Sequence, residues 1–244
     1  MISTDPTAAF PGSETSRRLG EYAAILGELH AVIPDKPGNF ASRWLKMLRK
    51  TWRSMREFDC EIVTVQAPDE WGLIGFFAAR YFGVPLQLQL HTDIMSPWYR
   101  RASWKERIRY WLARFLIPRA TCIRVVSERI RNSVQRLNLP REVQPRKISV
   151  LPIFTDVSKF LETRPDPITE ARFQNYSFKM IAVGRFMDKE KNFSMLIEVM
   201  RKFVKECPSA LLVLVGEGPD RENYKLQIIK YKLENNVFLE PWRA

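Results

Sequence analysis

The chain has 244 residues, of which 45% are hydrophobic and 27% charged, and this composition excludes a disordered tail, a collagen-like fibre and a disulfide miniprotein. Apolar runs such as Ala210–Gly216 are far shorter than the ~20 residues of a membrane-spanning helix. Three cysteines without a Cys-x-x-Cys pair predict neither a disulfide framework nor a zinc site, and they favour a reducing cytoplasm. The net charge is +12, of which residues 1–164 carry +10, so a polyanionic partner is expected: nucleic acid, nucleotide phosphates or an anionic membrane.

Strand-like and helix-like segments alternate along the chain. The predicted strands are Met1–Ser3, Leu29–Ile33, Glu61–Val65, Leu86–Leu90, Cys122–Val126, Ile148–Leu151, Lys179–Val183, Leu211–Val215 and Val237–Leu239. The predicted helices are Glu14–Leu26, Phe40–Glu57, Leu73–Phe82, Ser103–Leu116, Ser127–Leu137, Asn192–Glu206 and Asp220–Leu233, with Ser13 and Ser127 as N-caps. The polar stretch from Thr155 to Ser177 predicts a linker with some helix.

This repeated β-α-β order predicts an α/β protein with doubly wound parallel sheets covered by helices. Residues 1–164 contain six predicted strands, enough for a complete domain, whereas residues 165–244 contain three. Three strands make half of such a domain, so we expect the last strand to be an edge and apolar helix surface to be left uncovered.

Ligands of doubly wound domains bind at the carboxyl ends of the strands. Gly12 precedes the first helix, where a glycine lets the backbone approach a ligand, although a plain turn with a cap would look the same. His91 directly follows the strand Leu86–Leu90 and could bond to a sugar or phosphate, or act as an acid or base; a histidine in a structural loop is the alternative. His30 falls at the opposite edge and is predicted to be structural.

The next two strand ends carry glycines and cations. Gly184 and Arg185 end one strand, and Lys191 stands at the start of the following helix, which together predict a diphosphate cradle rather than a solvated basic loop. Gly216 and Glu217 follow the next strand and belong to a Gly-x-Gly motif. This motif is weak evidence for a ligand site, because a tight strand-to-helix turn also needs it.

Residues 43–56 and 98–119 interleave arginines and lysines with tryptophans. Cationic helices with tryptophan at the boundary suit an anionic lipid interface. A helix with its tryptophans in the core and its arginines in water gives the same pattern.

The motifs Val183-Gly-Arg-Phe, Lys191-Asn192 and Leu214-Val-Gly-Glu-Gly-Pro, with Pro11–Arg18 and His91-Thr-Asp before them, resemble glycosyltransferase family 4 of the GT-B fold over nearly the whole chain. The resemblance implies an N-terminal Rossmann-like acceptor-side domain (1–164) and part of a C-terminal donor-side domain (165–244). It further implies transfer from a UDP- or GDP-sugar with retention and without a metal or other cofactor. The implied catalytic residues are His91, Arg185 and Lys191, and the implied binding residues are Gly12, Gly184, Gly216 and Glu217.

The family pattern continues with a Glu-Gly-Phe-Gly-like segment and a second glutamate, whereas this sequence stops at Trp242-Arg243-Ala244. We therefore expect an incomplete transferase that has lost most of its activity. The implied role is cell-surface polysaccharide assembly on a saccharide or lipid-linked acceptor, in the cytoplasm or peripheral at the inner face of the plasma membrane.

Three other functions compete with sugar transfer. The first is a non-catalytic remnant that binds a nucleotide or a partner. The second is nucleic-acid binding, suggested only by the charge, since no binding module is recognisable. The third is a dinucleotide-dependent oxidoreductase, which lacks its Gly-x-Gly-x-x-Gly after the first strand. We expect no nucleic-acid partner.

Overall fold

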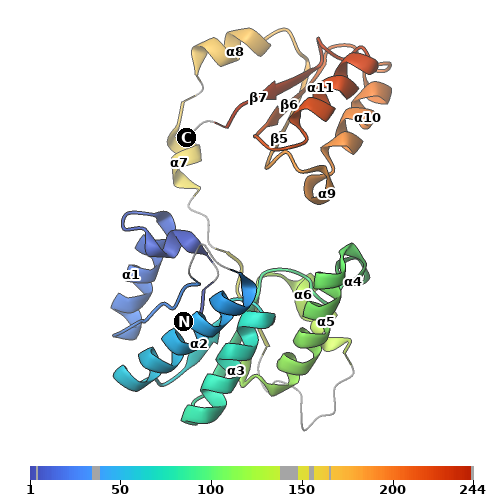
Figure 1. Cartoon of the computed structure of the whole chain (residues 1–244). Helices are drawn as coiled ribbons and strands as arrows, with labels where there is room; N and C mark the ends of the chain where they lie inside the picture. Colours follow the sequence, from blue (N-terminus) through green and yellow to red (C-terminus); the bar gives the residue numbers. More distant parts are fainter. Residues whose placement is uncertain (4, 35–38, 138–147, 154–156, 165, 243–244) are drawn as a thin grey trace. The chain divides into compact units, whose positions relative to one another are not determined.

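The computed structural model describes residues 1–3, 5–34, 39–137, 148–153, 157–164 and 166–242. The chain forms two compact units, Met1–Thr155 and Asp156–Ala244, here named the N-terminal and the C-terminal unit (Figure 1). The sequence analysis placed the domain boundary between residues 164 and 165. Residue 165 lies outside the described residues.

The N-terminal unit contains a parallel four-stranded sheet in the order β1 (Val63–Val65), β2 (Leu86–Leu90), β3 (Cys122–Val125) and β4 (Ile148–Val150). The prediction of two further strands at Met1–Ser3 and Leu29–Ile33 is wrong in extent. Ile2 makes only isolated parallel bridges, to Val32 on one side and to Val65 on the other. The pairing is this short because the chain turns into a 3-10 helix (η1, Pro6–Ala9) soon after Ser3.

The helices of the N-terminal unit begin where side-chain oxygens accept bonds from free backbone N–H groups. Ser13 and Ser127 cap as predicted, and Asn39, Asp69, Ser96 and Ser103 cap the other α-helices. The helices are α1 (Glu14–Leu26), α2 (Phe40–Glu57), α3 (Glu70–Phe82), α4 (Pro97–Ala102), α5 (Trp104–Leu116), η2 (Ile117–Arg119) and α6 (Glu128–Gln135). The sequence analysis missed α4 and started α3 three residues late.

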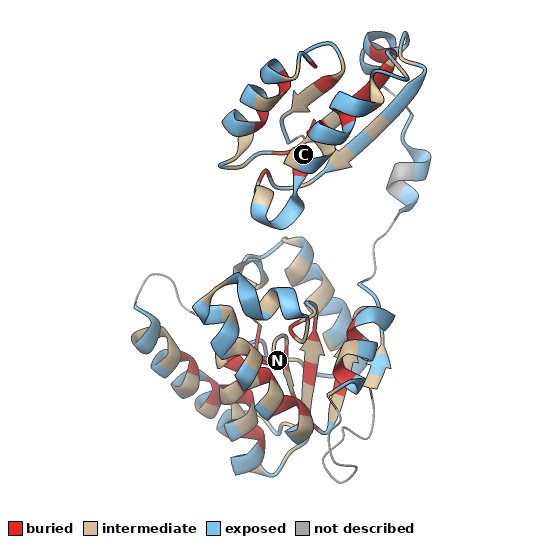
Figure 2. Cartoon of the chain, turned by 90° about the vertical axis from the view of Figure 1, so that its right-hand side faces the viewer, coloured by how far each residue is buried: buried red, intermediate tan, exposed pale blue. Residues whose placement is uncertain are grey.

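The core of this unit lies between the sheet and its covering helices, as the buried residues in Figure 2 show. The predicted inner face of α2 is confirmed, because Trp44, Leu48, Trp52 and Met55 pack against the core. Helix α1 differs: it contains no buried residue and exposes Tyr22, Ile25 and Leu26. The unit is therefore closely packed around α2, α3 and α5, and loosely packed around α1.

Asp69 is a buried carboxylate at the start of α3, with only 8% of its surface exposed. Its Oδ1 accepts hydrogen bonds from the backbone N–H groups of Trp71 (2.9 Å) and Gly72 (3.4 Å). Burial, joined by the negative charge of Glu70, raises the pKa of Asp69 to about 6. The neighbouring Glu70 differs because its hydrogen bonds and charge pairing with Arg109 outweigh burial and lower its pKa.

We expect Asp69 to make the protein less stable as the pH rises through this range. Because its pKa is higher in the folded than in the unfolded chain, its stabilising contribution is complete below pH 4 and lost by about pH 6, a change of about 3 kcal/mol. Asp69→Asn keeps a capping oxygen without the charge and should remove that loss. Urea unfolding between pH 4 and pH 7 measures the difference. Asp59→Asn, at an exposed position, is the control, and equal pH slopes for both variants would contradict the prediction.

The C-terminal unit contains a second parallel sheet, in the order β5 (Phe178–Val183), β6 (Ala210–Val215) and β7 (Val237–Glu240). The pairing runs from Phe178 with Ala210 to Val183 with Val215. The helices are α7 (Ser158–Glu162), α8 (Pro167–Phe173), α9 (Asp188–Lys191), α10 (Phe193–Phe203) and α11 (Arg221–Lys230). The helix predicted from Asn192 starts one residue later, because Asn192 adopts a left-handed conformation (φ 53°) that separates α9 from α10.

Helices α10 and α11 lie side by side over one face of this sheet and enclose its core (Figure 1). On the other face, α8 packs against β7 through Phe173 and Phe238, whose ring centroids are 5.5 Å apart. Within the described residues β6 is the central strand, and both β5 and β7 are edges. Ile181 and Val183 of β5 are 70% and 57% exposed, so the uncovered apolar surface lies on the sheet as well as on the helices.

Candidate functional site

The carboxyl edge of the C-terminal sheet is built from two loops that are hydrogen-bonded to each other. Gly184 N donates to Val215 O and Phe186 N donates to Glu217 O, both at 2.9 Å. Asp220 N closes the set by donating to Phe186 O at 3.1 Å. The loop after β5 and the loop after β6, which carry the predicted donor-side residues, therefore form one connected surface.

The two glycines of the Gly-x-Gly motif are required by this packing. A Cβ atom on Gly216 would lie 1.9 Å from Gly184 O, and one on Gly218 would lie 2.4 Å from Phe186 O. Both obstacles are backbone atoms, so they cannot rotate away as a side chain could. The close approach that Gly216 permits is thus made to the neighbouring loop.

Arg185 lies just after β5, and Lys191, the last residue of α9, reaches back to the same strand end. A Cβ on Gly184 would be 3.5 Å from Lys191 Cε, so the lysine side chain lies along the Gly184 backbone. Both cations are exposed, and neither forms an ion pair with another described residue. Two cationic side chains at one strand end can bind an anion without first breaking a bond inside the protein.

One of the free backbone N–H groups in the first turn of α10 is already hydrogen-bonded to a side chain of the protein. Asp188 Oδ1 accepts from Ser194 N at 2.8 Å and from the hydroxyl of Tyr224 at 3.1 Å. Asp188 N in turn donates to Asp220 Oδ2 at 2.7 Å. The helix N-terminus is therefore less available to a phosphate than the sequence suggested, and any anion site here depends on the two cations. No sequence signal marks Asp188, because it caps a residue six positions away.

Glu217 is exposed and accepts a hydrogen bond from Arg221 Nη1 at 3.2 Å. Arg221 also donates to the last carbonyls of the sheet, Gly216 O at 3.4 Å and Leu239 O at 3.3 Å. The sequence analysis missed this arginine. A cation four residues after Glu217, at the start of a helix, is the signal that could have indicated the pair.

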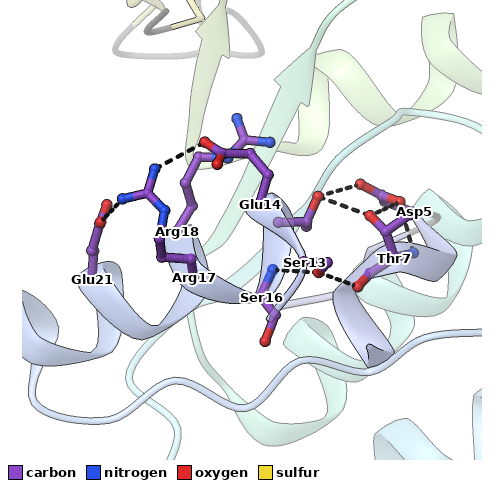
Figure 3. A network of polar contacts seen from close by, with 9 residues as sticks. Asp5, Thr7, Ser13, Glu14, Ser16, Arg17, Arg18 and Glu21 are labelled. Atoms are coloured by element: carbon purple, nitrogen blue, oxygen red, sulfur yellow. Dashed lines mark hydrogen bonds and ion pairs between the residues drawn. The ribbon is translucent and has the colours of Figure 1, made fainter. Parts of the chain in front are cut away.

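In the N-terminal unit, Gly12 lies in the exposed turn between η1 and α1 and has a φ of +83°. No heavy atom lies within 4 Å of the place where its Cβ would be. Beside it, Asp5 accepts hydrogen bonds from Thr7 N, Thr7 Oγ1 and Thr15 Oγ1 at 2.9, 2.7 and 2.8 Å, as part of the network in Figure 3. These bonds outweigh partial burial and lower the pKa of Asp5, so the loop contains a fixed anion next to a turn with open space around it.

His91 follows β2 directly, at the carboxyl edge of the N-terminal sheet. Its Nε2 lies 3.4 Å from Gln89 Oε1, which also accepts from Arg124 Nη1 at 3.3 Å. Although the residue is largely exposed, partial removal of water from its ring and the positive charge of Arg124 lower the pKa of His91. The imidazole is therefore neutral at physiological pH and has one donor and one acceptor nitrogen. Unlike His91, His30 stacks on Phe58 with centroids 4.3 Å apart, as a structural residue would.

We expect the His91 ring to titrate below the usual histidine pKa of about 6.5. The chain has two histidines, so proton NMR resolves both rings, and His91→Asn assigns them. Arg124→Gln removes the nearby charge and should raise the His91 midpoint, but only in part, because desolvation is the larger cause. A midpoint that Arg124→Gln leaves unchanged would contradict this electrostatic account.

The structure thus brings five of the seven candidate residues together at the carboxyl edge of the C-terminal sheet, namely Gly184, Arg185, Lys191, Gly216 and Glu217. Gly12 and His91 belong to the N-terminal unit, where His91 directly follows β2 and Gly12 lies in the turn between η1 and α1. Within the described residues no cluster of three or more His, Cys, Asp or Glu side chains could hold a metal ion.

The two basic aromatic segments differ in structure. In α2 the tryptophans point inward: Trp44 Nε1 donates to Glu70 O at 3.0 Å, and Trp52 packs against Tyr81 and Phe82. In α4 and α5 the tryptophans are exposed, by 79% at Trp98 and 68% at Trp104. The core interpretation therefore holds for α2, and the interface interpretation remains for α4 and α5. Within the described part of the chain, we find no helix with the length and apolar character needed to cross a membrane.

Two family models match the chain and together account for most of it. The model described as Glycosyltransferase Family 4 matches residues 8–159, and the model described as Glycosyl transferases group 1 matches residues 168–243. With two parallel α/β units, the chain has the GT-B class of fold. It belongs to glycosyltransferase family 4, and the resemblance inferred from its motifs is confirmed.

Known proteins agree with this assignment. An uncharacterized glycosyltransferase of Methanocaldococcus jannaschii is 27% identical over 96 residues, which are 38% of this chain and 23% of that protein. The crystal structure of Anabaena HepE with UDP has a TM-score of 0.66 at 19% identity, and the match covers 96% of this chain and 60% of HepE. The lipopolysaccharide outer core galactosyltransferase WaaB has a TM-score of 0.64 at 14% identity, over 100% of this chain and 67% of WaaB. The chain thus spans about three fifths of the length of HepE.

Proposed function

We propose that the protein transfers a sugar from a nucleotide-sugar donor, a UDP- or GDP-sugar, to a saccharide or lipid-linked acceptor with retention of configuration. The observation that carries this proposal is the pair of cations at the end of β5, Arg185 and Lys191, which form no ion pair with other described residues. HepE, a protein of the same fold, has been crystallised with UDP and with UDP-glucose, which supports a uridine nucleotide as the first donor to test.

In this proposal Arg185 and Lys191 bind the diphosphate of the donor. When the bond to the sugar breaks, negative charge develops on the departing diphosphate, and fixed cations stabilise it most where water is excluded. The planar guanidinium of Arg185 offers two parallel donors to one phosphate, whereas the ammonium of Lys191 acts as a point charge. Gly184 leaves room for the side chain of Lys191 to lie along this strand end.

The other candidate residues have supporting roles in the proposal. Neutral His91 contacts the donor sugar, because an uncharged imidazole can both donate to and accept from hydroxyl groups. Gly12 keeps the loop before α1 open for the acceptor or the phosphates. Gly216 and Glu217 border the nucleotide, with Glu217 held in place by Arg221.

The proposed process is cell-surface polysaccharide biosynthesis, with the protein in the cytoplasm and peripheral at the inner face of the plasma membrane. The strongly basic N-terminal unit supports an anionic acceptor or surface, since residues 1–164 carry most of the net charge. A nucleic-acid partner is not proposed.

An assay of sugar transfer tests this function. The chain is incubated with UDP-glucose, UDP-galactose, UDP-N-acetylglucosamine or GDP-mannose and a set of saccharide acceptors, and mass spectrometry detects a product enlarged by one sugar. The coupling constant of the new anomeric proton then shows whether configuration was retained. Nucleotide binding with little or no transfer would agree with the expected loss of activity and identify a nucleotide-binding remnant instead. Absence of both binding and transfer would overturn the proposal.

A further inference from the structure

Helix α5 has apolar residues on two of its faces. Ala113 and Leu116 are fully buried against the core of the N-terminal unit. A second set is exposed and recurs at helical spacing along the outer surface: Trp104 (68%), Ile108 (50%), Trp111 (59%) and Phe115 (39%). Steps of four, three and four residues place these side chains on one stripe of the helix. A surface helix of a water-soluble protein normally has only its core-facing stripe apolar, so the outer stripe calls for a covering partner.

Cationic side chains flank this outer stripe. Between residues 97 and 119 the chain has seven basic residues and one acidic residue, Glu106. Several cations lie next to the aromatic rings: Lys105 Nζ is 5.8 Å from the centre of the Trp104 ring, and Arg114 Cζ is 5.7 Å from that of Trp111. Arg119 Cζ is only 3.9 Å from the Phe115 ring. The partner must therefore offer both an apolar phase and a negative charge within the width of one helix.

A hollow of about 350 Å³ opens between α4 and α5. It is lined by Arg100, Arg101, Arg107 and Trp111, with no acidic side chain among them, and the surface that faces the hollow is mostly apolar. Guanidinium groups bind phosphate through paired hydrogen bonds, and they are weakly hydrated enough to do so at a membrane interface. Three arginines therefore surround an apolar hollow next to the apolar stripe, and their guanidinium groups can bind phosphate at its margin.

We propose that the surface formed by α4 and α5 docks on an anionic lipid bilayer. The outer stripe of α5 lies among the upper acyl chains, and the guanidinium groups of the arginines around the hollow bind the phosphates of anionic headgroups. The phosphates of a nucleic-acid duplex would pair with the cations but leave the apolar stripe in water. An anionic bilayer would pair with the cations and also bury the stripe. The proposal specifies which surface would make the protein peripheral to a membrane. It rests on the proposed function only for the identity of that membrane.

Sedimentation with lipid vesicles tests the charges. The full chain is mixed with vesicles of phosphatidylcholine, alone or with one third phosphatidylglycerol, and we expect binding to the anionic vesicles that weakens as salt rises. Arg101→Glu with Arg107→Glu should reduce the bound fraction at least about tenfold. Lys46→Glu with Arg49→Glu makes the same charge change on the exposed side of α2 and should have a much smaller effect. Equal losses in the two variants would show attraction by net charge alone and overturn the proposed surface.

A second pair of variants tests the apolar stripe without changing charge. Trp104→Ser with Trp111→Ser should weaken binding to anionic vesicles about tenfold, because the interfacial anchors are lost. Tyr22→Ser, at an exposed aromatic of α1, is the control. Circular dichroism checks that each variant is folded. We expect all of them to fold, because the substituted side chains are exposed. Unchanged binding of the double tryptophan variant would overturn the proposal.

The alternative partner is single-stranded nucleic acid, whose bases stack on exposed tryptophans. A fluorescent oligonucleotide that binds through Trp104 and Trp111, with no binding of the wild-type chain to anionic vesicles, would replace the membrane by a nucleic acid. Vesicle binding requires neither a sugar donor nor an acceptor. A negative result in the sugar-transfer assay therefore leaves this proposal standing, and a negative vesicle result leaves sugar transfer standing.

Discussion

Gly216→Ala is expected to unfold the C-terminal unit while the N-terminal unit stays folded. The new Cβ would lie 1.9 Å from the carbonyl oxygen of Gly184 and 3.0 Å from its carbonyl carbon. The Gly184 loop cannot retreat without breaking the bonds from Gly184 N to Val215 O and from Phe186 N to Glu217 O. We expect a loss of about 4 kcal/mol or more, a large part of the 5–15 kcal/mol that typically stabilises a domain.

The position of the tryptophans allows the two units to be followed separately. Trp242 is the only tryptophan of the C-terminal unit, and the other six belong to the N-terminal unit. Tryptophan fluorescence therefore reports mainly on the N-terminal unit, whereas hydrogen exchange read peptide by peptide reports on both. Exchange should become fast throughout β5, β6 and β7, with little change in the fluorescence transition. Gly20→Ala is the control, because its Cβ would meet nothing within 4 Å. Slow exchange in β6 of Gly216→Ala would refute the packing argument.

Removing the two cations at the end of β5 is expected to abolish strong nucleotide binding. A hydrogen bond to a charged group is worth about 1.5–3 kcal/mol, so Arg185→Ala and Lys191→Ala should each weaken the binding of UDP about 10- to 100-fold. Arg185→Lys should fall between wild type and Arg185→Ala, since it keeps the charge but loses the bidentate geometry. Isothermal titration calorimetry with UDP measures the dissociation constants.

The matched control for these variants is Lys202→Ala. Lys202 lies in the last turn of α10, at the end of the helix away from the carboxyl edge of the sheet, and is exposed. Its loss removes the same charge and should change the affinity for UDP very little. If Arg185→Ala and Lys202→Ala bind UDP equally well, the cations at the end of β5 are not the diphosphate site. The fold and family membership would be unaffected by that result.

Local sequence patterns predicted the fold where the local signal and the tertiary structure agree. The alternating residues of β2, the caps at Ser13 and Ser127 and the inner face of α2 all depend on neighbours within a few positions. The single bridges at Ile2 and Val32 could not be predicted, because their length depends on where the chain turns away from a distant partner.

The candidate site shows the same division. Its residues were found because strand ends of parallel sheets are where ligands bind, and the chemistry of arginine and lysine is evident from their identity. The partners of Asp188 and Arg221 depend on which loops meet in space, and no periodicity encodes that. The tryptophans of α2 and α5 have similar spacing in the sequence, and only the packing shows that Trp44 is inside and Trp111 outside.

The contact between Gly184 and Gly216 also has a consequence for how the C-terminal unit folds. The two glycines meet only when Val183 pairs with Val215, as it does in the native sheet. A slip of one position would bring Val215 or Glu217 to the place of Gly216, and the Cβ of that residue would collide with the carbonyl oxygen of Gly184. A shifted register of β5 against β6 is therefore destabilised by a steric clash between the loops at the strand ends. The loops that would bind the proposed donor therefore also fix the register of the sheet during folding.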